Sequence, residues 1–367
     1  MKIALVCPYD FSRPGGVKSH IVSLAKHLAM IGHQVKIIAP NINANLVEEK
    51  NVCFFGSNRS VNIGGTKIDV NIALGEEKKA LKAFLKEEDF DIIHYHTIWN
   101  PLLPFQVLKH SKTKQIATFH DTPKSEFVGK YVMPTVARGV FTFLDQIISV
   151  SKSQSSFISR FSKRHIHIIP NGIDLDEIKE LAPKKNSRND DYFQMFFMGR
   201  LEPRKGVMHA LMAFHKLKKR FPKMKLLIAG DGDGRGEVEK YISDFSLTDV
   251  ELLGFVDEKT KYKLLKESEI YLAPALYGES FGIVLLESMA VGTPIAGYAN
   301  AGYKNVITDV MNVGFAEPGN LDQFISSIEN LIPSEKREVL AKHGLEEVKK
   351  YDWAEVSKEV NSVYERV

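Results

Sequence analysis

The sequence predicts an α/β fold made of two successive parallel-sheet domains that face a cleft. Short apolar segments followed by amphipathic helical segments recur along the chain, and the series restarts after a polar, proline-led stretch at residues 183–191. Residues suited to bind a ligand follow the predicted strands, at the edge where parallel α/β sheets bind ligands. A chain of 367 residues is long enough for two such domains.

The composition is that of an ordinary soluble protein, with 44% hydrophobic and 26% charged residues. Cys7 and Cys53 are too few for a disulfide framework, which indicates a reducing compartment. The apolar run from Ile3 to Cys7 is too short for a secretory leader. The longest apolar stretch, 281–303, is broken by Glu, Gly and Pro and is therefore not a membrane span. We expect a cytoplasmic protein with no nucleic-acid partner.

The first predicted domain opens with a strand over Lys2 to Pro8 and a helix over Val17 to Ile31. Gly15 and Gly16 lie between them. A strand, a glycine turn and a helix bring backbone amides close to a phosphate, and Gly16 has no side chain to block the approach. The alternative is a purely structural turn.

Further strands are predicted over Val35 to Pro40 and, as several short irregular pieces, over Asn51 to Ala73. Residues 76–88 (EEKKALKAFLKEE) form a short amphipathic helix whose lysines give a solvated face over an apolar stripe. The net charge of +4 comes from an excess of Lys and Arg in the first half of the chain. That excess is compatible with an anionic membrane surface, an anionic acceptor or random variation.

Histidines mark the ends of two later strands. His94 and His96 are expected on opposite faces of one strand with no third ligand nearby, so we predict no metal site there. Trp99, in the loop that follows, either lines an acceptor cleft or covers the core. The strand over Gln115 to Phe119 ends at His120, which is either a satisfied strand-end histidine or a ligand-binding one.

The second predicted domain begins with a strand over Phe193 to Met198 and a basic loop directly after it. Arg200 and Lys205 in this loop suit a leaving diphosphate, because Arg grips two oxygens while Lys acts as a point charge. We interpret Arg204 as solvated. Asp231 and Asp233, after the next strand, form a D-x-D pair that could hold a divalent cation, but the two cations make a metal redundant.

The stretch ESFGIVLLESMAVGTPI follows the strand over Ile270 to Ala273. We predict that Ser280 caps a helix of about three turns that ends at Gly292. Glu279 then precedes the helix and Glu287 lies inside it, roughly 12 Å further along the axis. The N–H groups of Phe281, Gly282 and Ile283 form a helix N-terminus suited to phosphate.

A sugar nucleotide fits that layout, with the sugar at Glu279, the diphosphate at the helix start and the ribose at Glu287. The alternative is that Glu279 only complements the helix dipole and that Glu287 is salt-bridged or solvated. An acid between Leu286 and Met289 is costly to bury unless something pairs with it.

These motifs resemble the family 4 retaining glycosyltransferases, which have the GT-B fold of two Rossmann-like domains. The resemblance rests on ESFGIVLLESMAVGTPI, GRLEPRKG, the strand-end His120 and CPYDFSRPGGVKSH, and the last is similar to the phosphatidylinositol mannosyltransferase branch. It implies an acceptor domain over residues 1–182, a linker over 183–191 and a nucleotide-sugar domain over 192–351. A C-terminal helix over 352–367 then packs back on the first domain.

The resemblance also implies residue roles. Gly15 and Gly16 would contact the donor phosphate, His120 would hold the sugar near its reactive carbon, and the backbone at Val256 would contact the base. Arg200, Lys205 and Glu279 would be the other catalytic residues. The pattern after the signature, Tyr298 to Tyr303, departs from the family's adjacent glycines followed by glutamate, which leaves the donor open.

The implied activity is metal-independent transfer of a hexose, with retention and without a cofactor, to a lipid or glycan hydroxyl. GDP-mannose is the expected donor and a UDP-hexose the alternative. Helix 76–88 would dock on anionic lipid, which implies peripheral contact with the inner face of the membrane. A sugar-nucleotide epimerase or hydrolase on the same fold, and a non-catalytic nucleotide-sugar-binding protein, are the competing functions.

Overall fold

The computed structural model consists of two compact units, Met1–Gly172 with Trp353–Val367, and Ile173–Asp352. The predicted Trp99 loop and residues 184–191 of the predicted linker lie outside the described residues. No helix in the described part of the chain is both long and apolar enough to cross a bilayer. The residues that the structure describes are 1–12, 15–40, 51–63, 66–98, 102–120, 137, 139–183 and 192–367.

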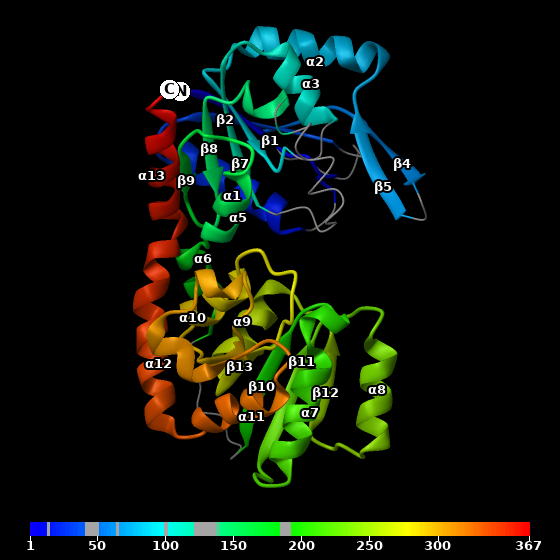
Figure 1. Ribbon diagram of the computed structural model, residues 1–367, viewed down its shortest axis with the longest axis vertical. Coiled ribbons are helices and arrows are strands. Elements are labelled where there is room, and N and C mark those ends of the chain that lie inside the picture. Colours follow the sequence, from blue (N-terminus) through cyan, green and yellow to red (C-terminus); the bar gives the residue numbers. More distant parts are fainter. Residues whose placement is uncertain are drawn as a thin grey trace. The chain divides into compact units, whose positions relative to one another are not determined.

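The first unit is built on a parallel sheet with the strand order β3-β2-β1-β6-β7-β8-β9 (Figure 1). Its strands are β1 (Lys2–Val6), β2 (Gln34–Ala39), β3 (Val52–Phe54), β6 (Ile92–His96), β7 (Lys114–Phe119), β8 (Gln146–Ser149) and β9 (Ile166–Ile168). Its helices are α1 (Gly16–Met30), α2 (Gly75–Glu88), α3 (Leu103–His110), α5 (Lys152–Ile158) and α13 (Trp353–Tyr364).

Alternation along β1 explains why helices cover both faces of this sheet. Ile3 and Leu5 are fully buried in a cluster with the apolar residues of α1 and α13. Ala4 and Val6 point the other way, into a cluster with α2 and α3. A strand that is buried on both faces is typical of a parallel sheet.

A two-stranded antiparallel hairpin, β4 (Ser57–Ile63) and β5 (Thr66–Ile72), stands apart from the main sheet (Figure 1). The prediction of several short strands over this stretch is confirmed by β3, β4 and β5, but β4 and β5 are not irregular, because they pair in continuous register from Ser57 with Ile72 to Ile63 with Thr66. The mixed polar composition of SNRSVNI gives little hydrophobic alternation, so the regular pairing leaves a weak signal in the sequence.

The second unit holds a parallel sheet with the order β12-β11-β10-β13-β14-β15. Its strands are β10 (Phe193–Met198), β11 (Met224–Ala229), β12 (Val250–Gly254), β13 (Ile270–Ala273), β14 (Ile295–Tyr298) and β15 (Phe315–Ala316). Its helices are α6 (Leu175–Leu181), α7 (Val207–Lys218), α8 (Arg235–Asp244), α9 (Glu258–Glu267), α10 (Ile283–Ala290), α11 (Leu321–Asn330) and α12 (Ser334–Glu347). Short 3-10 turns are η3 (Pro203–Lys205), η4 (Tyr303–Asn305), η5 (Asp309–Gly314) and η6 (Val348–Tyr351).

Both sheets have the doubly wound order in which the chain moves outward in one direction and then in the other. The direction reverses between β1 and β6 in the first unit and between β10 and β13 in the second. In the second unit α7 packs against α8 and α11, whereas α9 packs against α6 and α10. The predicted α/β fold with two parallel-sheet, Rossmann-like domains is thus confirmed.

The first unit ends at Gly172 rather than at residue 182. Asp174 caps α6 by accepting a hydrogen bond from the N–H of Glu177, and α6 packs on α9 of the second unit. The N–H of Ile173 also donates to the carbonyl of Tyr351. These contacts assign the segment after Gly172 to the second unit.

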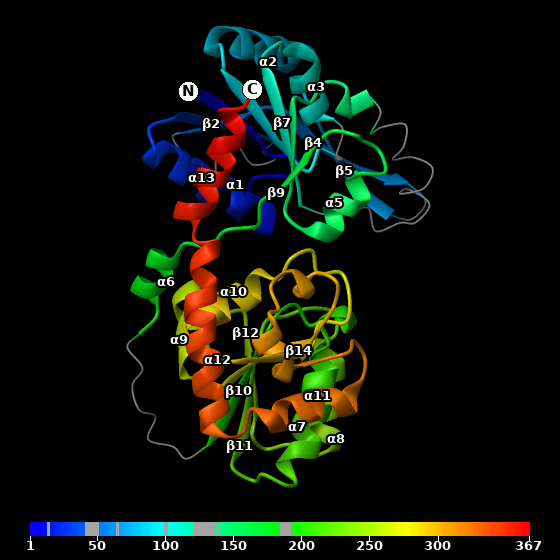
Figure 2. The same cartoon turned by 60° about the vertical axis from the view of Figure 1, so that its left-hand side comes forward.

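The C-terminal helix α13 completes the first unit and lies beside α1 (Figure 2). Trp353, only 2% exposed, stacks on His27 and meets the edge of His20 at 4.7 Å between ring centroids. A Cβ atom at Gly172 would lie 2.6 Å from the Trp353 ring, so glycine is needed where the chain leaves the unit. Close packing therefore fixes α13 at its first residue.

We expect Trp353→Ala to lower the free energy of unfolding of the first unit by about 3 to 5 kcal/mol, because it empties a large buried volume. Urea denaturation followed by circular dichroism measures the effect. Lys358→Ala, at an exposed position of the same helix, is the matched control and should shift stability by less than about 0.5 kcal/mol. Equal behaviour of the two variants would show that α13 does not stabilise the unit through Trp353.

Candidate functional site

The loops that leave β10 and β13 meet at the point where the order of the second sheet reverses. Nζ of Lys205, from the β10 loop, lies 2.6 Å from Oε1 of Glu279, from the β13 loop. Both side chains are largely buried, at 20% and 13% exposure. Open α/β sheets bind ligands at such a reversal, so this pair marks the candidate site of the second unit.

Arg204 belongs to the same cluster, and its interpretation as solvated was wrong. Its Nε lies 2.7 Å from Oε2 of Glu202, and its NH1 lies 3.6 Å from Oε1 of Glu279. Arg200 is 73% exposed and reaches Glu202 at 3.4 Å. Burial alone would raise the pKa of Glu202, but Arg204 and Arg200 outweigh it and hold this pKa below its usual value. Sequence reasoning missed Glu202, although it lies within the basic motif.

The two loops are fastened to each other through their backbones. Gly206 has a φ of 74°, and a Cβ there would lie 1.9 Å from the carbonyl oxygen of Pro274. The N–H of Leu276 donates to the carbonyl of Arg204 at 2.8 Å. Only glycine permits both the left-handed backbone and this approach, and the contact brings the end of η3 against the exit of β13.

A second close contact, between Gly302 and the backbone of Glu279, supports the β13 loop. A Cβ at Gly302 would lie 2.2 Å from the Glu279 carbonyl oxygen. Asn300, which is 4% exposed, accepts the N–H groups of Gly302 and Tyr303 and donates to the carbonyl of Ala275. Sequence reasoning did not assign a role to Asn300, but an Asn shortly after a strand and two residues before a glycine is typical of such a turn.

The helix after Glu279 starts later than predicted. Gly282, with a φ of 112°, is the N-cap of α10, and Ser280 provides no cap. The helix has 8 residues and begins at Ile283, so Ile283 and Val284 present the first free amides, and Phe281 and Gly282 precede them. Gly282 cannot be replaced by a larger residue, because a Cβ would lie 2.8 Å from the Tyr303 ring.

Phe281 contributes to the core and not to a ligand surface. Its side chain is 3% exposed and meets the ring of Tyr351 at 5.9 Å between centroids. The burial of this ring and the left-handed backbone of Gly282 together delay the helix start. Only the backbone of Phe281 remains available to the candidate site.

Glu287 lies inside α10, as predicted, and pairs with Lys261 of α9 at 2.9 Å. The two side chains are 13% and 7% exposed. Burial raises the pKa of Glu287, and Lys261 opposes the shift; burial would lower the pKa of Lys261, but Glu287 reverses this and raises it. Of the interpretations given for Glu287, the structure therefore shows the salt bridge, which it forms with Lys261. Lys261 was not singled out from the sequence.

Two other predicted positions of the second unit lie on neighbouring loops. Val256 follows β12 and packs partly buried against the core, whereas the adjacent Phe255 is 89% exposed. Asp231 of the D-x-D pair accepts the N–H of Gly232 at 2.8 Å and lies 3.9 Å from Arg235. The loop itself therefore engages this carboxylate.

In the first unit, Gly15 is the N-cap of α1 and Gly16 its first residue. A Cβ at either glycine would have no heavy atom of the described residues within 4 Å, so these residues leave room for a ligand to approach the backbone of the turn. His20, on the next turn of α1, meets His120 at 4.4 Å between ring centroids. The glycine turn and His120 thus belong to one edge of the sheet.

The argument that His94 and His96 lie on opposite faces was wrong. Residues two apart on a strand share a face, and the two ring centroids are 4.5 Å apart. A third histidine is also present: Nδ1 of His96 lies 3.0 Å from Nε2 of His120. Among the residues that the structure describes, the grouping with metal-like spacing is His20, His96 and His120, whose ligand atoms lie within 4.8 Å of one another.

The three histidines of this group and the adjacent His94 are neutral at neutral pH. Burial lowers the pKa of His120 to about 4 and that of His94 to about 3. Burial also lowers the pKa values of His20 and His96 well below the usual value, and neighbouring histidines add to the effect. Below neutral pH, protons therefore bind more readily to the unfolded chain than to this cluster.

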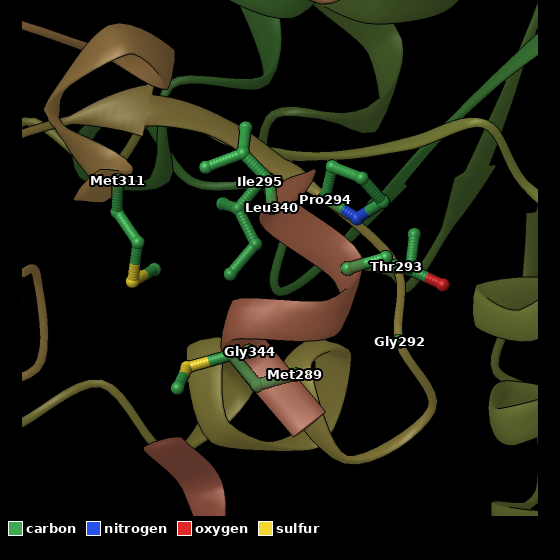
Figure 3. A pocket seen from close by; sticks show the side chains of 9 residues that line it. Met289, Gly292, Thr293, Pro294, Ile295, Met311, Leu340 and Gly344 are labelled. Carbon is green, nitrogen blue, oxygen red and sulfur yellow. The ribbon is translucent and has the colours of Figure 1, made fainter. Parts of the chain in front are cut away.

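A small apolar cavity in the second unit is separate from these residues. It lies among α10, β14 and α12, next to Met311 (Figure 3), and is lined by Met289, Ile295 and Leu340. Its volume of about 10 Å³ holds a single water at most. It is a packing gap and not a ligand site.

Comparison with known proteins gives the context for this geometry. Residues 14–177 match the family described as Glycosyltransferase Family 4, and residues 178–346 match the family described as Glycosyl transferases group 1. The chain is 31% identical over 390 residues to a phosphatidyl-myo-inositol mannosyltransferase of Mycobacterium tuberculosis, covering 100% of this chain and 97% of that protein. The corresponding protein of Mycolicibacterium smegmatis is 30% identical, with coverage of 100% and 94%.

Solved structures share the fold at lower identity. A glycosyltransferase from Rickettsia africae has a TM-score of 0.81 at 16% identity, covering 100% of this chain and 98% of that chain. Anabaena HepE in complex with UDP and glucose has a TM-score of 0.74 at 18% identity, with 100% of both chains covered.

We expect the first unit to lose stability as the pH falls from 6.5 towards 4. A histidine whose pKa is lowered by folding reduces the free energy of unfolding by about 1.4 kcal/mol for each pH unit by which the pH falls between its unfolded and folded pKa values. Above its unfolded pKa the same histidine has no effect on stability. Unfolding in urea between pH 5 and pH 7.5, followed by tryptophan fluorescence, reports on this unit, because both tryptophans belong to it.

His94→Asn should make that pH dependence shallower, because it removes one of the buried rings. His165→Asn, at an exposed position of the same unit, is the control and should leave the slope unchanged. If the His94 variant kept the full slope, the buried histidines would not be its source.

Proposed function

Because the chain belongs to glycosyltransferase family 4 and has the GT-B fold, we propose that it is a retaining, metal-independent hexosyltransferase that uses a nucleotide diphosphate sugar. The observation that carries the proposal is the contact of Lys205 with Glu279 at the sheet reversal of the second unit. A cation and a carboxylate fixed side by side there suit a diphosphate and the sugar attached to it. The proposed reaction uses no cofactor, and the nucleotide diphosphate sugar is a substrate.

The preferred donor is GDP-mannose and the acceptor a lipid or glycan hydroxyl. The support is full-length identity of about 30% with phosphatidyl-myo-inositol mannosyltransferases. A UDP-hexose is the second candidate, favoured by the fold likeness to HepE, which was solved with UDP and glucose. The turn around Asn300 and Gly302 lies beside Glu279 and departs from the family pattern, which is why two donors are proposed.

In the proposed reaction the second unit stabilises the leaving nucleotide. Lys205 and Arg200 would share their positive charge with the diphosphate as the bond from the sugar carbon to the phosphate oxygen breaks. The free N–H groups of Ile283 and Val284 would donate hydrogen bonds to another phosphate oxygen. Glu279 would orient sugar hydroxyls, Glu287 would bind the ribose, and the backbone at Val256 would contact the base.

The first unit would supply Gly15 and Gly16 to the donor phosphate and His120 to the sugar. We propose no nucleophilic carboxylate, and therefore no covalent intermediate with the enzyme. The acceptor attacks the sugar directly, and the leaving phosphate acts as the base. The acceptor oxygen forms a bond to the sugar carbon on the face from which the phosphate departs, and the acceptor proton moves to the phosphate oxygen. This sequence of events retains the configuration of the sugar carbon.

We further propose that the enzyme acts at the cytoplasmic face of a membrane, where α2 would contact anionic lipid. Lys79 on this helix is 75% exposed and pairs with Glu76, which is 88% exposed. Glu88, in contrast, is held by Lys2 and Lys36. Exposed lysines on an amphipathic helix favour a lipid surface, and the paired glutamates weaken that preference.

The test is incubation with a panel of GDP- and UDP-sugars, with and without lipid extract. Transfer predicts nucleotide release that depends on the acceptor and persists in EDTA. An epimerase or hydrolase, the competing enzymes on this fold, would act on the donor without any acceptor. Binding without turnover would instead identify a nucleotide-sugar-binding protein.

We expect Lys205→Ala to reduce kcat by about 10²-fold or more with the fold intact, because it removes the buried cation at the diphosphate. Initial rates with the active donor measure this loss, and circular dichroism checks the fold. Lys216→Ala, an exposed lysine of the same unit paired with Asp322, should retain normal activity. Near-normal turnover of the Lys205 variant would remove that residue from the mechanism.

A further inference from the structure

His96 and His120 form a hydrogen bond whose direction is not free. Nδ1 of His96 and Nε2 of His120 are 3.0 Å apart, and the rings are nearly parallel, at 20°. Both side chains are buried, at 0% and 6% exposure. Between two neutral imidazoles one nitrogen carries the proton and the other accepts it, so each ring is restricted to one tautomer.

The second nitrogen of His96 decides between the two directions. Nε2 of His96 is buried and has no hydrogen-bond partner among the residues that the structure describes. If His120 were the donor, His96 would carry its proton on Nε2 and bury an N–H group without an acceptor. If His96 is the donor, that nitrogen is a bare lone pair, which is the less costly group to bury unpaired.

The neighbours of His96 hold its ring in place. His94 packs against it and is itself fixed at both nitrogens, by the hydroxyl of Tyr364 at 2.6 Å and by Thr118 Oγ1 at 2.7 Å. His20 meets the His96 ring edge-on at 5.3 Å between centroids. A ring packed on two sides cannot turn to exchange its nitrogens without disturbing its neighbours.

We propose that His96 is a positioning residue that donates from Nδ1 to Nε2 of His120 and thereby fixes His120 as the tautomer with its proton on Nδ1. His120 then offers an N–H group, and not a lone pair, from its other nitrogen. This inference rests on the proposed function for its consequence, because a sugar oxygen would be the acceptor of that N–H. The tautomer itself is a property of the protein without donor.

The direct test is nitrogen NMR of the ligand-free protein labelled with ¹⁵N-histidine. The His120 signals are identified by their loss in His120→Gln. We expect protonated Nδ1 and unprotonated Nε2 for His120, and a protonated Nδ1 for His96. A proton on Nε2 of His120 would overturn the proposal, and so would a change of these signals on EDTA treatment, because a metal would then join the nitrogens.

Two variants separate donation from simple packing. The amide of His96→Asn places an N–H near the position of Nδ1, whereas His96→Leu fills the space without a donor. His120 should keep its Nδ1 proton in the Asn variant and redistribute it to Nε2 in the Leu variant. An unchanged His120 tautomer in the Leu variant would show that another group fixes it.

The kinetic consequence follows the same pair of variants. We expect His96→Leu to lower kcat about tenfold, the effect of one misdirected hydrogen bond, with little change in KM, and His96→Asn to restore most of it. Equal losses in both variants would argue against the donor role. If no sugar donor is turned over at all, the proposed function fails, while the NMR result still decides the tautomer.

Discussion

The contact between Lys205 and Glu279 is the interaction on which the geometry of the candidate site in the second unit depends. It joins two loops that leave neighbouring strands at the sheet reversal, and the backbone contacts of Gly206 and Gly302 hold those loops in place. Neither side chain would be stable alone at this degree of burial, because a largely buried charge needs a partner. The pair therefore keeps a cation and an anion at one point, where both a phosphate and a sugar hydroxyl can find complementary groups.

Much of the fold could be predicted because its signals are local. The strands β10 and β13 have the predicted bounds, and the helix α13 lies within the predicted range 352–367, since each is an uninterrupted apolar or amphipathic segment. Lys205 and Glu279 were recognised individually from motifs on either side of the reversal. Their direct pairing was not predicted, because the sequence does not show which of several basic and acidic side chains in two distant loops will touch.

The features that sequence reasoning missed depend on tertiary contacts. The start of α10 is set by the burial of Phe281 and by the Tyr303 ring against Gly282, and not by the good capping residue Ser280. In the sequence of α9, Lys261 looks like any exposed lysine, and only its contact with Glu287 of α10 shows that it belongs to a buried ion pair. The histidine group combines α1, β6 and the end of β7, so no window of sequence contains it. Each case is a long-range contact that overrides a local preference.

The return of α13 to the first unit has a consequence for how the protein is made. The sheet of that unit is synthesised early, yet the helix that covers its α1 side is synthesised only after the whole second unit. At the usual pace of about 5 to 20 residues per second, the ribosome finishes the second unit while the apolar surface around His20 and His27 still faces water. The nascent protein thus spends many seconds with an open hydrophobic face, which is a natural binding surface for a chaperone.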